Sequence, residues 1–311
     1  MSQFKAAIAI HGGAGLLNPP DYSPEKLDNY FRTLQESLKT GHKILEQGGS
    51  SVEAVIQSVK VMENCPLFNA GKGGVFAENG IVELDASIMD GKNLKAGAVT
   101  CVHKIKNPIV AAREVMDFSP HVILSGDGAE LFAYKRALEI LPNEYFQTPE
   151  RLSQLYKAKE KNKITLDHSY GTVGAVAIDQ SGNLCAGTST GGLTNKYYGR
   201  VSDTSIIGAG NYANNKTCAI SGTGTGDPFI RSVLAYDFSC LMEYKNYSLE
   251  KAGNIVLNKL KEIGGHGGII AIDKDGNVYM DFNSTGMFRG FIKDNQIYYG
   301  AFEKLNKGEL K

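Results

Sequence analysis

The chain has 311 residues, with 33 Lys and Arg balanced by 33 Asp and Glu, and a formal net charge of zero at pH 7. Its 42% hydrophobic and 21% charged residues are typical of a globular protein with one large core or two small ones. This balance gives no electrostatic reason to expect nucleic acid or a membrane surface as a partner, and no apolar run approaches the length of a membrane span.

Cysteine and histidine usage points away from disulfides and transition metals. The five cysteines form no Cys-x-x-Cys pair, and the apolar segment 6–10 is too short for a signal peptide. These features predict reduced thiols in a cytoplasmic enzyme. The six histidines have no metal-ligand spacing, so packing or surface roles are expected for them; His11, directly before Gly12 and Gly13, is the one of most interest.

The first half of the chain predicts strands and pairs of helices. Residues 6–10 are typical of a buried strand that runs into the glycine loop 11–15. Two capped helices follow, one after Ser23 and one after Ser50, whose Glu53 completes a capping box. Apolar and polar residues alternate over 82–88, which predicts a half-buried strand. Further elements are expected at 98–102 (strand), 111–116 (helix) and 129–141 (helix).

The second half becomes rich in strands. Periodicity is lost over 142–169, where a lysine-rich run at 157–163 predicts a solvated helix end or a mobile segment. Segments 177–184 and 271–278 resemble each other, and each predicts a β-hairpin with a Gly/Asn turn. Helices are expected at 229–242 and 249–263. Because both halves carry strands and helix pairs, we expect an α+β fold of one domain, residues 1–311, built as a four-layer αββα sandwich.

Three local patterns suggest other chemistry but lack the context that each requires. Residues 187–191 fit the G-x-S-x-G elbow of serine hydrolases, with Ser189 as nucleophile and Asp227 and His266 as partners, but poor helix formers follow the serine. Residues 208–213 match a dinucleotide fingerprint without the helix that should follow. The glycine-rich segment 222–227 precedes a helix, where an anion can bind, but it has no P-loop lysine.

Thr172 is the residue on which a functional interpretation depends. An internal threonine hydroxyl is a poor nucleophile, and no base lies beside it in sequence. If the Gly171–Thr172 bond were cut, the new α-amino group, with a reference pKa of about 7.7–8.0, would be partly neutral near pH 7. That amine can act as the base for the hydroxyl of its own residue. The hypothesis is a precursor that cuts itself between residues 171 and 172.

Such a hydrolase needs a second hydroxyl, oxyanion donors and groups that hold the substrate. Thr190 follows across one predicted hairpin, so it can stand beside Thr172 on the neighbouring strand. Thr223 and the Gly224 amide lie in a glycine-rich turn, where N–H groups can point outward. Arg200 is a candidate clamp for a carboxylate, and Asp203 is a candidate partner for an ammonium group.

At these residues the chain resembles the plant-type asparaginase/isoaspartyl peptidase family of N-terminal nucleophile hydrolases. Gly171, in place of the aspartate that usually precedes the nucleophile of glycosylasparaginases, favours the plant-type branch. The shared stretches run along essentially the whole chain in the family's order: residues 11–15, 68–71, 84–91, 96–99, 107–109, 171–177, 188–192, 199–201 with Asp203, and 208–210.

The resemblance implies an αββα sandwich that cleaves itself into an α chain, 1–171, and a β chain, 172–311, with two such units pairing. It implies hydrolysis of β-aspartyl dipeptides and L-asparagine to L-aspartate, without a catalytic cofactor. By this resemblance Thr172 is the nucleophile and its own base, Thr190 is the hydrogen-bond partner of its hydroxyl, and Asn69 positions the cleavage site. Thr223 and Gly224 would form the oxyanion hole. Arg200 would bind the substrate carboxylate, and Asp203, with Gly226 nearby, would bind the substrate amine.

The resemblance also implies a structural sodium ion held by backbone carbonyls. The matching loop residues are Met62, Glu63, Cys65, Phe68, Ala70 and Lys72.

Three alternatives stay open from the sequence. A taspase-like threonine endopeptidase would act on protein partners, although the Arg200/Asp203 pair favours small substrates with free amino-acid ends. A non-enzymatic binder that uses its glycine loops for an anion would remain a single uncut chain. A serine hydrolase built on Ser189 would keep its activity when Thr172 is replaced.

Overall fold

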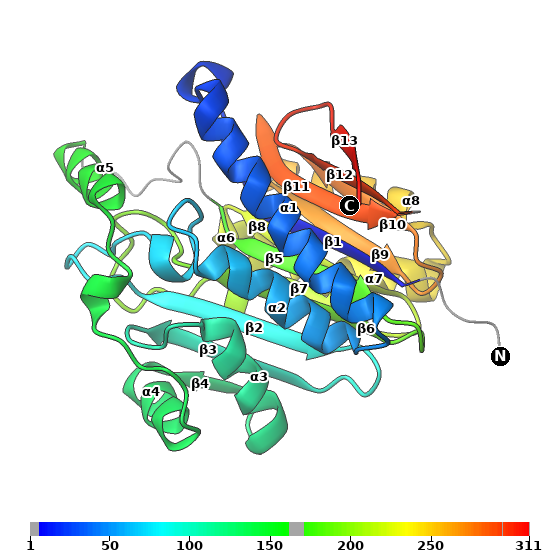
Figure 1. Cartoon of the computed structure of the whole chain (residues 1–311), viewed down its shortest axis with the longest axis horizontal. Helices are drawn as coiled ribbons and strands as arrows, with labels where there is room; N and C mark the ends of the chain where they lie inside the picture. The colour runs from blue at the N-terminus through cyan, green and yellow to red at the C-terminus, as the bar shows by residue number, and fades with distance from the viewer. Residues whose placement is uncertain (1–5, 162–170, 294, 311) are drawn as a thin grey trace.

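The structure is a computed structural model that describes residues 6–161, 171–293 and 295–310. Two sheets pack face to face, and helices cover the outer face of each sheet (Figure 1). The predicted four-layer αββα sandwich is therefore confirmed. Within the described ranges, no helix is both long and apolar enough to cross a membrane.

The larger sheet has the strand order β13-β12-β11-β1-β5-β6-β2-β3-β4. All neighbours pair antiparallel except β3 and β4, which are parallel. Its strands are β1 (Ala7–Gly15), β2 (Leu84–Asp90), β3 (Ala96–Val102), β4 (Ile123–Ser125), β5 (Val173–Ile178), β6 (Leu184–Thr190), β11 (Gly286–Lys293), β12 (Gln296–Gly300) and β13 (Asn306–Glu309). The chain therefore places β1 and β6 on either side of β5, the strand that follows Thr172.

The smaller sheet is antiparallel throughout, in the order β10-β9-β8-β7. Its strands are β7 (Asn211–Ala213), β8 (Cys218–Gly224), β9 (Gly267–Asp273) and β10 (Val278–Phe282). β8 faces β5 and β6 of the larger sheet, which brings the glycine-rich end of β8 close to the start of β5.

Helices α1, α2 and α3 cover the larger sheet, and α7 and α8 cover the smaller one (Figure 1). The α-helices are α1 (Pro24–Glu46), α2 (Ser51–Glu63), α3 (Pro108–Phe118), α4 (Gly126–Lys135), α5 (Pro149–Glu160), α6 (Gly226–Ser232), α7 (Leu234–Lys245) and α8 (Leu249–Glu262). The predicted caps are present: the Ser23 and Ser50 hydroxyls accept hydrogen bonds from the amides of Lys26 and Glu53 at 3.1 and 3.2 Å.

Three hydrophobic clusters fill the spaces between the four layers. One lies between α1–α3 and the larger sheet, one lies between the two sheets, and one lies between the smaller sheet and α7–α8. The middle cluster is small and rich in alanine. Polar side chains share this space between the sheets, among them the fully buried His11, Thr188 and Ser221.

Three expectations about local structure were wrong. The segment 11–15 is not a loop, because β1 continues through it to Gly15 with a bulge between His11 and Gly13. The helix expected at 129–141 ends at Lys135, since Ala137 has a left-handed φ of 57°. Val233, at φ 49°, divides the helix expected at 229–242 into α6 and α7.

The region 142–169, where periodicity is lost, contains the helix α5, capped by the Thr148 hydroxyl. Lys157 and Lys159 lie in its last turn, as expected for a solvated helix end, whereas 162–170 lie outside the described residues. The two predicted hairpins are present as β5–β6 and β9–β10. They share a turn in which Asp179 or Asp273 accepts hydrogen bonds from amides two and four residues later.

Candidate active site

The Thr172 hydroxyl lies where the hairpin prediction placed it, beside Thr190. Thr172 directly precedes β5 and is 5% exposed, and Thr190 ends the neighbouring antiparallel strand β6. The Thr172 hydroxyl donates to Thr190 Oγ1 at 3.1 Å, and the Gly192 amide donates to the same oxygen at 3.0 Å. Two donors therefore fix the Thr190 hydroxyl against the proposed nucleophile.

The Gly171 end of the proposed cleavage bond is enclosed by β1 and the end of β8. A Cβ atom built on Gly171 would lie 2.8 Å from the Ala14 nitrogen and would also clash with the Thr223 hydroxyl. A Cβ on Gly13, whose φ is +116°, would lie 2.6 Å from the Gly171 nitrogen. Only glycine fits at these two touching positions, so the backbone at residue 171 lies directly against Thr223.

The residues expected in a glycine-rich turn, Thr223 and Gly224, are instead the last two residues of β8, where they pair with Gly268 and Gly267 of β9. The Thr223 hydroxyl is fully buried and accepts a hydrogen bond from the Ala14 amide at 3.1 Å. Gly224 has a φ of +147°, and the next amide, of Thr225, donates to the His266 carbonyl at 2.8 Å. These hydrogen bonds hold the end of β8 beside residue 171, where oxyanion donors would be needed.

Arg200, Asp203 and Gly226 come together although they are separated in sequence. A Cβ on Gly226 would clash with Asp203 Oδ1 and would lie 2.9 Å from an Arg200 guanidinium nitrogen. Arg200 already binds one carboxylate, since its guanidinium donates to Asp227 Oδ2 at 2.7 Å. The Asp227 side chain is 63% exposed, so a bound ligand can reach the same guanidinium group.

Asp203 is a buried acid with an open hydrogen-bonding position. It is 2% exposed, and its Oδ2 atom has no partner among the described residues. Burial raises the pKa of its carboxyl group to about 7, although the positive charge of Arg200 acts in the opposite direction. A ligand ammonium group would satisfy this oxygen and would stabilise its ionised form.

Comparison with known proteins identifies the family of this chain. The profile of the family described as Asparaginase matches residues 4–300. The chain belongs to the asparaginase family. Its relatives include the isoaspartyl peptidases of Escherichia coli (strain K12), 49% identical with 92% of each chain covered, and of Salmonella typhimurium, 48% identical with 92% of this chain and 95% of the relative covered.

A more distant relative is named for both activities. The isoaspartyl peptidase/L-asparaginase of Xenopus laevis is 41% identical, with 97% of each chain covered. These names support the amidohydrolase interpretation and give no support to the taspase-like alternative.

The loop that carries Arg200 and Asp203 is held by three polar side chains along β2 and the residue before it. Both Glu83 carboxylate oxygens accept the Gly199 amide at 3.1 Å, Asp85 Oδ2 accepts the Ser202 amide at 2.9 Å, and the Ser87 hydroxyl donates to the Thr204 carbonyl. The buried Lys196 ammonium also donates to the Glu83 carbonyl at 3.0 Å. Sequence reasoning missed these anchors, because their alternation with apolar residues resembles an exposed strand face.

Asn69 lies beside the loop that follows Thr190. Its side-chain amide donates to the Gly192 carbonyl at 2.8 Å, and its Oδ1 atom accepts the Val75 amide at 3.0 Å. The Gly191 amide also donates to the Asn69 carbonyl at 3.0 Å. Asn69 therefore fixes the chain immediately after Thr190.

The loop expected to bind sodium folds back on the carboxyl end of α2. A Cβ on Gly71 would collide with the Glu63 carbonyl, and the Arg151 guanidinium donates to the Gly73 carbonyl at 2.8 Å. The Lys72 ammonium lies 5.4 Å from the Tyr145 ring centre, so this side chain is engaged outside the loop. The carbonyls of Met62, Cys65 and Ala70 accept backbone hydrogen bonds from Cys65, Phe68 and Gly73, and the loop follows the negative end of a helix dipole, which favours a cation. The residues predicted for it, Met62, Glu63, Cys65, Phe68, Ala70 and Lys72, all lie in this turn of chain.

The serine-hydrolase pattern does not form a site. Ser189 is fully buried inside β6, and its hydroxyl donates to Glu63 Oε1 at 2.7 Å. Asp227 pairs with Arg200, and His266 is hydrogen bonded through its backbone to Thr225. A nucleophile elbow requires a turn between a strand and a helix, which Ser189 does not occupy.

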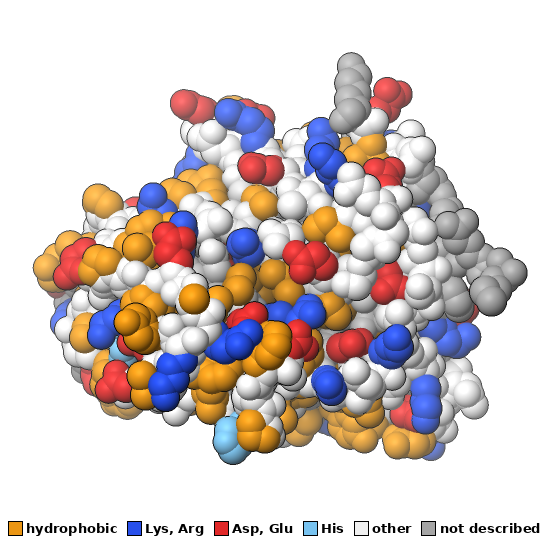
Figure 2. Space-filling view, turned by 60° about the horizontal axis from the view of Figure 1, so that its bottom comes forward, with side chains coloured by type: hydrophobic (Ala, Val, Ile, Leu, Met, Phe, Trp, Pro, Cys, Tyr) orange, Lys and Arg blue, Asp and Glu red, His pale blue; other side chains and the backbone are white. Residues whose placement is uncertain are grey.

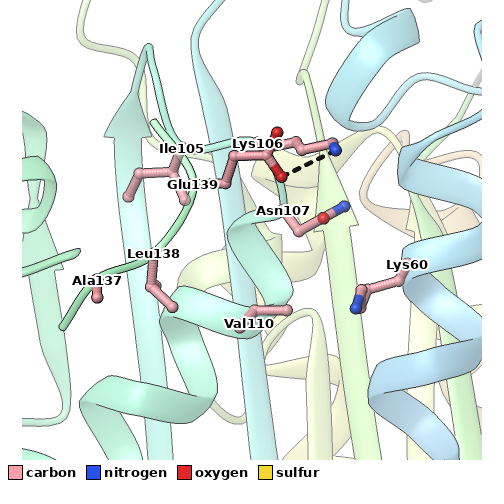
Figure 3. Close-up of a pocket in the computed structure, with 8 residues that line it drawn as sticks. All are labelled: Lys60, Ile105, Lys106, Asn107, Val110, Ala137, Leu138 and Glu139. Carbon is pink, nitrogen blue, oxygen red and sulfur yellow. Dashed lines mark hydrogen bonds and ion pairs between the residues drawn. The ribbon is translucent and has the colours of Figure 1, made fainter. Parts of the chain in front are cut away.

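Two other features lie away from Thr172. A surface cavity of about 200 Å³ lies between α2 and α3, with Lys60, Asn107 and the Lys106–Glu139 ion pair in its lining (Figure 3). His103, Asp127 and Glu130 place their ligand atoms within 4.8 Å of one another, which histidine spacing did not predict. Glu130 Oε1 already accepts the amides of His103 and Lys104 at 2.6 and 3.0 Å.

Proposed function

We propose that this chain is a threonine-nucleophile amidohydrolase that cuts its own Gly171–Thr172 bond and then releases L-aspartate from β-aspartyl dipeptides and L-asparagine. The observation that carries the proposal is the position of this bond. Its threonine hydroxyl pairs with Thr190, and its glycine lies against Thr223. The names of the relatives supply the substrate class.

Self-cleavage proceeds by an N-to-O acyl shift. The Thr172 oxygen attacks the Gly171 carbonyl carbon, the carbon–nitrogen bond breaks, and the hydroxyl proton passes to the departing amine. Water then hydrolyses the ester, which leaves a carboxylate on residue 171 and a free amine and hydroxyl on residue 172. Gly171 suits this reaction because a side chain at this position would push the carbonyl away from Thr223.

Substrate hydrolysis repeats the same chemistry with an external amide. The neutral Thr172 amine takes the proton of its own hydroxyl, which attacks the β-carbonyl of the substrate. Ammonia or an amino acid leaves with that proton, and water releases aspartate from the β-aspartyl ester. Thr223 and the Gly224 amide supply the oxyanion donors, while Thr190 orients the nucleophile.

Substrate selection follows from Arg200 and Asp203. The guanidinium group, which can bind a carboxylate in a bidentate manner, takes the α-carboxylate, and the buried carboxylate takes the α-ammonium group. Gly226 leaves the space between them open. Both substrates carry these two groups, whereas an internal aspartate of a protein carries neither.

A sodium ion bound by the 62–72 carbonyls is part of this proposal, as a structural ion without a catalytic role. It would fix the segment that carries Asn69 and so the chain after Thr190. The expected result of exchange into sodium-free buffer is a lower melting temperature, restored by sodium chloride but not by tetramethylammonium chloride. Equal melting temperatures in the two salts would argue against the ion.

Pairing of two such units, in the cytoplasm, is also proposed. Large hydrophobic side chains are exposed on α3, β4 and α4, among them Phe118, Ile123 and Tyr134, at 57, 45 and 74%. Figure 2, in which the lower part of Figure 1 comes forward, shows hydrophobic side chains gathered on the left of that face. Several large hydrophobic side chains exposed on neighbouring elements are typical of an interface. Sedimentation should give twice the mass of 33.6 kDa, and a stable monomer would contradict the pairing.

The activity is tested by following aspartate release. We expect release from β-aspartyl dipeptides and from L-asparagine, none from a folded protein substrate, and none after Thr172→Ala substitution. Ser189→Ala serves as a matched control, since it removes a buried hydroxyl of the neighbouring strand. Retained activity in Thr172→Ala, or cleavage of the folded protein alone, would refute the proposal.

A further inference from the structure

His11 connects the residue expected to be the nucleophile to the polar layer between the sheets. It is fully buried in β1, directly opposite Gly174 of β5. Its Nδ1 atom lies 2.9 Å from the Thr172 carbonyl oxygen, and its Nε2 atom lies 2.7 Å from the Ser221 hydroxyl. Both ring nitrogens are therefore engaged, one of them on the main chain of Thr172.

The partners of the ring allow one direction of proton donation. A carbonyl oxygen only accepts, so Nδ1 must carry the hydrogen that reaches Thr172. In the neutral ring Nε2 then accepts, and the Ser221 hydroxyl donates to it. Burial lowers the pKa of His11 to about 3, so the ring is neutral at physiological pH. A neutral ring with both nitrogens occupied serves to orient Thr172 rather than to transfer a proton.

Further buried hydrogen bonds continue to the loop expected to bind the substrate, and their direction of donation runs outward from the Asn211 side-chain amide to both ends. Ser221 accepts from Thr188 at 2.9 Å, and Thr188 in turn accepts from the Asn211 side-chain amide at 3.0 Å. The same amide donates to Ser87 Oγ at 2.7 Å, and Ser87 donates to the Thr204 carbonyl, next to Asp203. One chain of buried hydrogen bonds thus runs from the backbone of the nucleophile to the loop expected to hold the substrate amine.

The sequence of β5 leaves room for this arrangement. A Cβ atom on Gly174 would overlap both His11 Nε2 and the Ser221 hydroxyl. Every residue of β5 is buried, and glycine at this position leaves the imidazole in contact with Ser221. Gly174 lies two residues after Thr172, on the strand that directly follows it.

We infer that His11, held in place by Ser221 and protonated on Nδ1, is the positioning residue that fixes the Thr172 main chain for self-cleavage and for hydrolysis. The inference rests on the proposed function. A donor on the Thr172 carbonyl fixes the peptide plane after residue 172 and hence the directions of both its amine and its hydroxyl. Such positioning acts on kcat, because Arg200 and Asp203 hold the substrate independently of this bond.

Two nearly matched substitutions separate positioning from simple packing. In His11→Asn the side-chain amide nitrogen replaces Nδ1 and keeps the donor to Thr172, whereas in His11→Gln the amide replaces Nε2 and keeps only the contact with Ser221. We expect His11→Gln and His11→Phe to slow self-cleavage and to lower kcat about tenfold to hundredfold, the loss typical of one buried hydrogen bond. His11→Asn should recover most of this loss, with the KM for L-asparagine unchanged in all three.

Rates are measured in the full chain, with self-cleavage followed on denaturing gels and kcat expressed per cleaved molecule. If His11 had only a structural role, His11→Asn would have a kcat no higher than that of His11→Gln. KM would then rise as stability is lost. Equal kcat in wild type and His11→Phe, or equal losses in the Asn and Gln variants, would overturn the inference.

The tautomer gives a second readout that does not depend on activity. Nitrogen-15 spectra of the imidazole groups, with His11 assigned from the His11→Phe difference, should show a neutral ring protonated on Nδ1 at pH 7. Ser221→Ala should leave the ring protonated on Nδ1, because the Thr172 carbonyl can only accept a hydrogen bond. An Nε2–H ring in the wild type would refute the inference even if the chain proved inactive. An active chain with unaffected His11 variants would refute the inference alone and leave the proposed function intact.

Discussion

Thr172 has hydroxyl neighbours on two sides, and they differ in what they do. Thr190 receives the hydrogen bond of the nucleophile hydroxyl, while Thr223 lies on the side of Gly171, where oxyanion charge would develop. The two threonines come from different sheets, β6 and β8, so the sandwich itself sets the distance between them. Loss of either hydroxyl is expected to act on the chemical step rather than on substrate binding.

Thr190→Val should lower kcat with little change in KM. Valine keeps the shape but removes the hydroxyl at 3.1 Å from Thr172 Oγ1, and a buried hydrogen bond is worth about 1–3 kcal/mol, or about fivefold to hundredfold in rate. Thr190→Ser keeps the hydroxyl and is the control. Steady-state rates on L-asparagine check the prediction, which fails if Thr190→Val matches the wild type.

Asp203 makes ligand affinity depend on pH. Its carboxyl group has a raised pKa of about 7, so below pH 7 it is neutral and attracts an ammonium group poorly, and above pH 7 it is ionised. We expect L-aspartate to inhibit about tenfold more weakly at pH 6 than at pH 8.

Succinate is the control ligand, because it carries the two carboxylates of L-aspartate but no ammonium group. Any pH effect of the Thr172 amine on carboxylate binding would also change the inhibition by succinate. Its inhibition should lack the step near pH 7, and Asp203→Asn should remove that step for L-aspartate. An inhibition constant for L-aspartate that stays constant between pH 6 and pH 8 would contradict the assigned role.

Among the elements, β2 shows best what the sequence could and could not predict. The alternation of Glu83, Asp85 and Ser87 with apolar residues correctly predicts a strand, but all three polar side chains are buried. A period of two shows that the faces differ, not whether water or another part of the chain covers the polar one. The loop that carries Arg200 covers it, and this contact joins residues more than 100 positions apart.

The close crossing of α1 and α2 gives a prediction at the element scale. Ser37 and Ser58 each donate to the other's carbonyl, at 2.8 and 2.9 Å, and a Cβ on Gly41 would lie 3.0 Å from the Ala54 carbonyl and clash with Ser58. Gly41→Ala should lower the free energy of unfolding by about 1–2 kcal/mol, although alanine favours helices.

Gly128, inside α4, is the matched control, since a Cβ there meets no atom within 4 Å. Gly128→Ala should raise the free energy of unfolding by up to about 1 kcal/mol. Urea unfolding of both variants in a Thr172→Ala background keeps the chain uncut and the comparison simple. Equal stabilisation by both substitutions would show that the helix crossing tolerates the extra methyl group.

At the scale of the whole molecule, local pattern predicts the parts of the site that are local in sequence. Thr190 stands beside Thr172 because one hairpin joins them, which strand periodicity and a Gly/Asn turn suffice to predict. The glycine-rich sequence and the family resemblance pointed to Thr223, but its meeting with Gly171 and Ala14 depends on three strands of two sheets and could not be predicted from local pattern. The ring of His11 between the sheets, with its two partners, required the structure.

The four layers also explain how a cut chain can stay together. β5 begins directly after Thr172 and lies between β1 of the expected α chain and β6 of the expected β chain. β2 pairs with β6 across the same division. Backbone hydrogen bonds in the middle of the larger sheet therefore hold the two expected fragments to each other without the bond at residue 171.

The most direct measurement is the intact mass of the purified chain under denaturing conditions, with N-terminal sequencing of the smaller fragment. We predict two fragments, residues 1–171 and 172–311, the second beginning with Thr172, and aspartate release that grows in step with their appearance. Thr172→Ala should remain one chain and release no aspartate. A chain that stays intact while it hydrolyses L-asparagine at full rate would contradict the central claim.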